Sequence, residues 1–404
     1  MTKHNRRSMA ILVVTLVVVM LGFGMIIPLI PFYIDAFGAS GSELGLLMAT
    51  FAAMQFFFAP VWGRLSDRHG RKWILMIGIL GNALSQLFFG LSTELWMLFA
   101  SRALTGILSA ATLPTAMAYI GDSTSEEDRG GGMGMIGAAM GAGMVLGPGL
   151  GGWLATQSLS LPFFVAAGLS MLTLLFVLLA LPESLPKEAR TQGGKSLQGP
   201  QFGEMWRALF GPIGFLLILA FLVSYGLSNF EAVFGLYALE RYDYGPARVG
   251  TILTVIGLAS AIVQGGLTGP LAKRWGAVTI IRASLLGSAI GFVLMLQAKT
   301  YVAVLLTVSF FIVSNALLRP AVSALISQRA TGGQGMAMGL NNSFMSLGRM
   351  VGPAWAGFVF DTNISYPYYS GSFIMHVGFL LSLGRLKERT PVQDQPVTET
   401  ETLL

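Results

Sequence analysis

Twelve long apolar segments limit the fold of this chain more than any other feature. They lie at about 9–34, 43–62, 72–92, 95–120, 131–157, 161–182, 210–238, 247–272, 277–297, 300–326, 334–360 and 367–385. Each is long enough to cross the roughly 30 Å of hydrocarbon in a bilayer as a helix. Charged residues make up 11% of the chain, against about 25% in soluble domains. Uniformly apolar segments of this length do not suit barrel strands, so the sequence predicts an all-α membrane protein.

The positions of lysine and arginine predict how the chain crosses the membrane. If the N-terminus lies inside, 19 of the 25 basic residues fall in cytoplasmic segments and three fall outside. The other three, Arg102, Arg319 and Arg349, lie within apolar segments. Basic residues concentrate on the cytoplasmic side of membrane proteins. We therefore expect a multi-pass protein of the cell (inner or plasma) membrane with both termini in the cytoplasm.

Two motifs recur at nearly the same distance along the chain. The pattern G-x-L-x-x-R-x-G at 63–70 returns at 269–276, and G-x-x-x-G-P at 143–148 returns at 348–353. The offsets are 206 and 205 residues. A constant offset over such a distance indicates two related halves, which in transporters enclose a substrate site near the middle of the bilayer.

The longest polar stretch separates these halves. It begins after Pro182 and contains further prolines and paired glycines, which is typical of a linker. We expect a six-helix half at 1–182, a cytoplasmic linker at 183–209, a second six-helix half at 210–389 and a disordered tail at 390–404.

The loop at 63–72 reads GRLSDRHGRK and resembles the signature loop of the major facilitator superfamily. Gly63 and Asp67 are four residues apart and so share a helix face, where the carboxylate can pair with a neighbouring helix end. The resemblance implies a latch between the halves in the outward-facing state, made by Gly63, Asp67, Arg68, Gly70 and Arg71. In the second copy Lys273 stands where Asp67 stands in the first, so we expect that loop to latch weakly. An ordinary basic loop is the alternative interpretation.

A glycine stripe marks the fifth segment. Gly143, Gly147 and Gly151 share one helix face, with Pro148 and Gly152 beside them. Small residues let two helices pack backbone to backbone, and proline kinks the helix. The string resembles the antiporter motif of drug:proton exporters, which favours export over uptake. Generic tight packing is the alternative.

Ionisable residues inside apolar spans are costly and therefore usually functional. Glu231 is the one carboxylate well inside a segment, and its helical neighbours Ser224, Ser228 and Gly235 form a small, polar face. A carboxylate there can exchange protons and attract a cation, and competition between the two would couple their transport. Arg102 matches an arginine of the fourth helix that the family resemblance implicates in proton transfer. A structural ion pair for Glu231 and snorkelling for Arg102 are the alternatives.

Three strings extend the resemblance to the NorA/Bmr group of multidrug exporters in the twelve-helix drug:proton antiporter family. They are Asn-Phe-Glu at 229–231, Leu-Arg-Pro-Ala-Val at 318–322 and the glycine–proline pattern at 348–353. By that resemblance the drug cavity is lined by Glu231, Arg319, Phe51, Gln55 and Asn341. One departure matters, because the group has an acid where this chain has Ala316, so a scheme with two carboxylates does not carry over.

Aromatic side chains near a carboxylate can hold flat cations by stacking and cation–π contact. Tyr225 and Phe230 flank Glu231 in sequence and are our candidates for this role, together with Phe51, Phe56 and Phe234. Most of the 27 phenylalanines will instead face lipid.

These features predict a proton-coupled antiporter that exports hydrophobic, often cationic, small molecules, which would confer multidrug efflux and antibiotic resistance. The alternative is a proton-coupled transporter of one metabolite, sugar or lipid. An ATP-driven pump is disfavoured because Ala189 stands where a phosphate-binding loop ending in Gly194-Lys195-Ser196 needs glycine. The three histidines are scattered and cysteine is absent, so we expect neither an enzyme nor a metal site. We expect a monomer with no cofactor and no nucleic-acid partner, whose ligands are substrate, protons and lipid.

Overall fold

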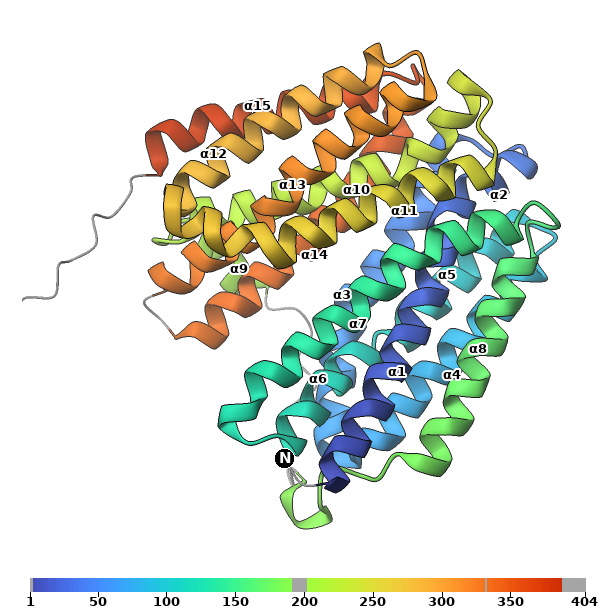
Figure 1. Cartoon of the computed structure of the whole chain (residues 1–404), viewed down its shortest axis with the longest axis vertical. Helices are drawn as coiled ribbons and strands as arrows, with labels where there is room; N and C mark the ends of the chain where they lie inside the picture. Colours follow the sequence, from blue (N-terminus) through green and yellow to red (C-terminus); the bar gives the residue numbers. More distant parts are fainter. Residues whose placement is uncertain (1–2, 191–201, 331–332, 387–404) are drawn as a thin grey trace, which may run out of the picture.

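The computed structural model of the chain describes residues 3–190, 202–330 and 333–386, and helices dominate it (Figure 1). The first half contains α1 (Lys3–Ile26), the 3-10 turn Ile27–Leu29, α2 (Ile30–Ala36), α3 (Gly41–His69), α4 (Arg71–Gly90), α5 (Leu95–Ser109), α6 (Thr112–Ser123), α7 (Glu126–Leu154) and α8 (Leu161–Ala180). The second half contains α10 (Gly214–Tyr242), α11 (Pro246–Ile262), the π-helical turn Val263–Leu267, α12 (Thr268–Gln297), α13 (Tyr301–Arg329), α14 (Gln334–Phe360) and α15 (Tyr366–Arg385). The predicted all-α fold is confirmed.

Three predicted segments are not single straight helices. Pro28 and Pro31 interrupt the first, which consists of α1, a 3-10 turn and α2, because proline removes a backbone donor. The fourth is divided into α5 and α6. The eighth, 247–272, consists of α11, the π-helical turn and the start of α12, and its predicted boundary with 277–297 falls at Gly276, whose non-helical φ of +75° divides α12. Glycine accepts that left-handed conformation without steric cost.

The predicted linker contains ordered structure. A 3-10 turn covers Lys187–Ala189, and a short helix, α9 (Phe202–Leu209), leads into α10. Phe202 of α9 lies 6.1 Å from Phe56 of α3, measured between ring centroids, so the linker touches the first half. The rest of the linker, at 191–201, and the predicted tail at 390–404 lie outside the described residues.

Within the described residues, nine helical stretches are long and apolar enough to cross a membrane. One of them, Pro246–Gln297, contains the bend at Gly276 and covers two predicted spans. The remaining two predicted spans are α14 and α15, which are helices of 27 and 20 residues. Polar and small residues lower the mean hydropathy of these two helices. For example, α14 carries two asparagines and an arginine within it.

The helices gather into two bundles that converge at one end and diverge at the other (Figure 1). We name the end where they converge the closed end; it carries the connections at 36–41, 154–161, 242–246 and 360–366. The opposite end, the termini end, carries the start of α1 and the end of α15. A side chain added at Gly63, Gly269 or Gly339, all near the termini end, would meet nothing within 4 Å.

Glycines on α7 and α14 set the packing of both bundles. Gly143 and Gly147 of α7 lie against the backbone of α1 at Leu21 and Gly24. Gly348 and Gly352 of α14 lie in the same way against the backbone of α10. A methyl group at these glycines would clash with that backbone, so the close approach depends on their lack of a side chain.

Candidate functional site

The second half places one acid and two bases together within its spans. Glu231 lies midway along α10, half-buried, and it interacts electrostatically with Arg349 of α14. Arg349 is in turn repelled electrostatically by Arg319 of α13. Both arginine side chains are exposed in the isolated chain, and Arg349 donates a hydrogen bond of 2.9 Å to Ser346 Oγ. The result is a cluster of one carboxylate and two guanidinium groups at the junction of α10, α13 and α14.

No ion pair within 4.0 Å joins Glu231 to any described residue. The alternative of a structural ion pair is therefore not formed as a direct contact in this conformation, although Glu231 interacts electrostatically with Arg349. A carboxylate that has no tight partner is available to a proton or to a cation. Ala316 is buried next to Asn315 on α13, at the position where the resemblance implied a second acid.

Arg102 occupies the first half in a different setting. Its side chain is 4% exposed, and its guanidinium carbon lies 5.3 Å from the ring centre of Phe89 and 5.9 Å from that of Phe51. Two of its nitrogens, Nε and Nη2, have no hydrogen-bond partner among the described residues. Arg102 is thus buried between aromatic rings rather than snorkelling to an interface, and no acid of the described part of the chain pairs with it.

The other predicted cavity residues are divided between partly accessible and buried positions. Phe51 and Gln55 of α3 are half-buried, and Phe51 packs 5.4 Å from Phe23. Tyr225 is 3% exposed, and Phe230 is fully buried between Phe234 and Phe311. In this conformation Tyr225 and Phe230 therefore offer almost no surface to a ligand.

Asn341 is buried on α14 and donates a hydrogen bond of 3.2 Å to Ser323 Oγ of α13. Its side-chain oxygen has no partner among the described residues. A buried acceptor without a partner is costly, so this oxygen is available to a donor from a ligand or water.

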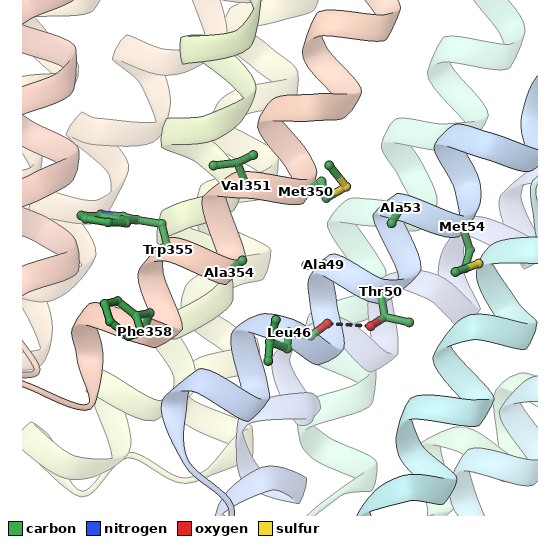
Figure 2. Close-up of a pocket in the computed structure, with 10 residues that line it drawn as sticks. All are labelled: Leu46, Ala49, Thr50, Ala53, Met54, Met350, Val351, Ala354, Trp355 and Phe358. Atoms are coloured by element: carbon green, nitrogen blue, oxygen red, sulfur yellow. Dashed lines mark hydrogen bonds between the residues drawn. The ribbon is translucent and has the colours of Figure 1, made fainter. Parts of the chain in front are cut away.

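An apolar groove lies between the two halves, along α3 and α14 (Figure 2). It has a volume of about 620 Å³ and is lined by Leu46, Ala49, Thr50, Ala53, Met54, Met350, Val351, Ala354, Trp355 and Phe358. Its one hydroxyl, that of Thr50, donates to Leu46 O of its own helix at 2.8 Å. None of the predicted site residues lines it, although Phe51 and Arg349 directly adjoin lining residues in sequence.

The signature loop forms a charge network inside the first half. Arg71 donates from Nη1 to Asp67 and from Nε to Asp122, the latter at 2.9 Å. Its backbone N–H donates to Glu183 Oε1 at 2.8 Å, so Glu183 caps the start of α4. Gly70, with φ +103°, leaves room for that carboxylate. In this conformation Asp67 pairs within its own half, and Gly63 packs against nothing.

The predicted antiporter motif contacts two helices at once. Gly151 packs on the backbone of α1 at Met25, next to the contacts of Gly143 and Gly147, whereas Gly152 packs on the backbone of α11 at Pro246. The carbonyl of Pro148 approaches Gly250 of α11. The stripe therefore serves packing within the half on one face and contact across the halves on the other.

Two contributors to these sites were not predicted from the sequence. Arg349 lies near Glu231 only because α14 packs on α10, which no local pattern encodes. Glu183 was assigned to the linker, yet its place directly after a span beside a glycine turn was a usable signal for a helix cap. Within the described residues no group of three or more His, Asp or Glu side chains could hold a metal ion.

Comparison with known proteins agrees with this architecture. A family model described as Major Facilitator Superfamily matches residues 12–314 and 216–403. "Multidrug resistance protein 2" of Bacillus subtilis (strain 168) is 34% identical over 374 residues, covering 92% of this chain and 94% of the relative. "Quinolone resistance protein NorA" of Staphylococcus aureus (strain COL) is 29% identical over 390 residues, covering 96% and 99%. The crystal structure of the nucleoside transporter NupG superposes with a TM-score of 0.76 at 14% identity, covering 96% of this chain and 100% of that one.

Proposed function

Because the chain belongs to the major facilitator superfamily of membrane transporters, we propose that it is a proton-coupled antiporter that exports hydrophobic, often cationic, small molecules. Its relatives named for multidrug and quinolone resistance support efflux as the direction of transport. Members of this family are multi-pass membrane transporters rather than enzymes. We propose further that both termini face the cytoplasm, which makes the termini end the cytoplasmic one.

Glu231 is the observation on which the coupling proposal depends. It is a half-buried carboxylate in the middle of a span, without an ion pair among the described residues. When ionised it can hold a cationic cargo, and when protonated it releases that cargo. Arg349 offers the ionised carboxylate an electrostatic partner once the cargo has left. One proton would then exchange for one positive charge, without the second acid that Ala316 replaces.

The apolar groove supports a hydrophobic cargo. Its lining presents methyl, thioether and aromatic groups, and its one hydroxyl is already bonded. A groove of about 620 Å³ between the halves falls in the size range of small-molecule sites. Such a surface suits molecules that partition into lipid.

Transport of one anionic metabolite is the second candidate. It is favoured by Arg319 and Arg349, which bring two positive charges to one carboxylate. A guanidinium group binds carboxylates and phosphates through paired hydrogen bonds. In that case Glu231 would serve to moderate the positive charge rather than to bind cargo.

Everted membrane vesicles containing the protein test the proposal. We expect a lipophilic cationic dye to accumulate inside when a proton gradient is imposed, and we expect a proton uncoupler to abolish the accumulation. Vesicles without the protein provide the baseline. Dye accumulation that persists with the uncoupler would contradict antiport, and accumulation of an anionic metabolite but no dye would support the second candidate.

A further inference from the structure

The closed end holds a contact between the halves that involves a carboxylate and the start of a helix. Asp361 follows α14 in the second half, whereas α3 begins at Gly41 in the first half. Oδ1 of Asp361 accepts from the backbone N–H of Gly41 at 2.6 Å, and Oδ2 accepts from that of Ser42 at 2.9 Å. The hydroxyl of Ser42 also donates to Oδ2.

We propose that Asp361 is a positioning residue for the transport cycle, which acts by capping α3 across the boundary between the halves and so holds the closed end shut. The first N–H groups of a helix have no partner within it. The N–H of Glu43 is satisfied locally by Ser40 Oγ, but those of Gly41 and Ser42 are bonded to Asp361 of the other half. A carboxylate at this place also interacts favourably with the helix dipole.

The surrounding packing brings the carboxylate to its donors. A side chain at Gly41 would come within 2.8 Å of Asp361 Oδ1 and 3.1 Å of the carbonyl of Gly357. One turn further along α3, a side chain at Gly45 would clash with the carbonyl of Pro353. Backbone therefore meets backbone at this contact, and the cap forms only while α3 and α14 remain this close.

The second contact between the halves has the same packing without the cap. With the 205-residue offset between the halves, Gly45 corresponds to Gly250 and Pro353 corresponds to Pro148. Gly250 and Pro148 also meet closely, where α7 crosses α11. The same step takes Asp361 to Thr156. Among the described residues Thr156 donates only to Trp153 O of its own helix, and α11 begins without a side-chain cap.

The start of α11 is also poorly suited to a cap. Pro246 stands where α3 has Gly41, and proline has no N–H to donate. Ala247 stands in place of Ser42, so the hydroxyl donor is missing as well. The carboxylate cap is thus present at one of two equivalent contacts, which means that packing alone does not require it.

Like charges near the cap oppose closure. Glu240 at the end of α10 interacts unfavourably with Asp361 and with Asp35 of the first half. Bringing the halves together at the closed end therefore concentrates negative charge. The hydrogen bonds of Asp361 offset part of this repulsion, which leaves the closed state stable but able to open.

Distances between spin labels test this inference directly. The chain contains no cysteine, so labels can be placed at Thr93→Cys and Lys299→Cys, in closed-end connections of different halves. We expect Asp361→Ala and Asp361→Asn to shift the population toward longer distances. Loss of a helix cap changes the ratio of closed to open molecules by about 2-fold to 30-fold. Asn keeps one acceptor oxygen and should therefore give the smaller shift. Thr156→Ala is the matched control and should leave the distances unchanged.

Unchanged distances in both Asp361 variants would overturn the inference. Asp361→Asn preserves shape, so it keeps the test valid if the Ala variant does not fold, and Asp361→Glu should restore part of the short-distance population. The measurement needs no cargo. It requires only that the halves move, so a failure here is distinguishable from a failure of the proposed export activity in vesicles.

Discussion

The two halves of this transporter repeat their packing glycines and prolines but not the charges at mid-span and at the closed end. Gly143, Gly147 and Pro148 of the first half have counterparts 205 residues later, and both sets pack against a neighbouring helix backbone. By contrast, Arg349 corresponds to Met144, and the carboxylate that caps α3 corresponds to a threonine. The repeated residues shape the close contacts between helices, whereas the unrepeated charges make each half chemically distinct.

The charges also differ in depth between the halves. In the first half the described acids of the signature network, Asp67, Asp122 and Glu183, gather around Arg71 at the termini end. In the second half Glu231 lies in the middle of a span. A network at the end of the bundle suits a conformational contact, and a lone acid at mid-span suits the carriage of a proton.

Replacing Glu231 should have the largest effect, because it removes the one mid-span acid that distinguishes the second half. We expect Glu231→Gln to lose the dependence of transport rate on pH and to lower uncoupler-sensitive efflux by at least about 10-fold, within the usual range of coupling free energies. Dye efflux at several pH values checks this. Glu94→Gln, an exposed acid in a connection, is the control. Ordinary pH dependence in Glu231→Gln would show that another group carries the proton.

Side chains added at the repeated glycines should act equally in both halves. Gly45→Ala and Gly250→Ala each place a methyl group against a proline carbonyl of the opposite half. Such overpacking costs about 1–3 kcal/mol, so both variants should open the closed end and slow transport. Spin-label distances between positions 93 and 299 report the opening.

Gly168→Ala is the matched control, since a side chain there meets nothing within 4 Å. A clear effect at one of the two contacts and none at the other would mean that the halves do not move symmetrically.

The signature loop gives a test in which the halves should differ. Among the described residues Asp67 pairs with Arg71 of its own half, and its expected role is to latch the two halves together when the termini end closes. Asp67→Asn should then raise the population of the conformation described here, in which the bundles diverge at the termini end, by about 2- to 5-fold. This is the usual contribution of a charge at a helix end. Lys273→Gln, at the matched position, should change little. Equal shifts in both variants would remove the asymmetry that we infer.

The sequence was sufficient for features that depend on local chemistry. Apolar length predicted the spans, and the glycine spacing predicted backbone-to-backbone packing of α7. Each of these follows from what a residue does to its own helix. They do not require knowledge of which helix lies alongside.

The sequence was less informative where the partner decides the outcome. Closeness to Glu231 in sequence made Tyr225 and Phe230 candidate cavity residues, but α10 is buried on almost every side, so closeness along the helix does not identify an accessible surface. Arg349 approaches Glu231 through the packing of α14 on α10, and Asp361 meets Gly41 across more than 300 residues of sequence. The first contact is set by the packing of helices within the second half, and the second by the docking of the two halves.

Installing the missing cap should have the smallest effect and would sharpen the comparison most. Thr156→Asp supplies a carboxylate at the end of α7, and Pro246→Gly supplies the N–H that α11 lacks. The double variant should stabilise the closed state by about 2-fold in population, at the low end of what caps contribute, because glycine adds flexibility that opposes the gain.

The same spin-label pair measures that change, with Thr156→Asn plus Pro246→Gly as the uncharged comparison. A further test combines the graft with Asp361→Asn, and we expect short distances to return in part. Such a rescue would mean that a carboxylate cap at either contact holds the closed end, whichever half supplies it. If the graft changes nothing while Asp361→Asn opens the molecule, the effect of Asp361 depends on its surroundings near Glu240 and Asp35 rather than on capping itself.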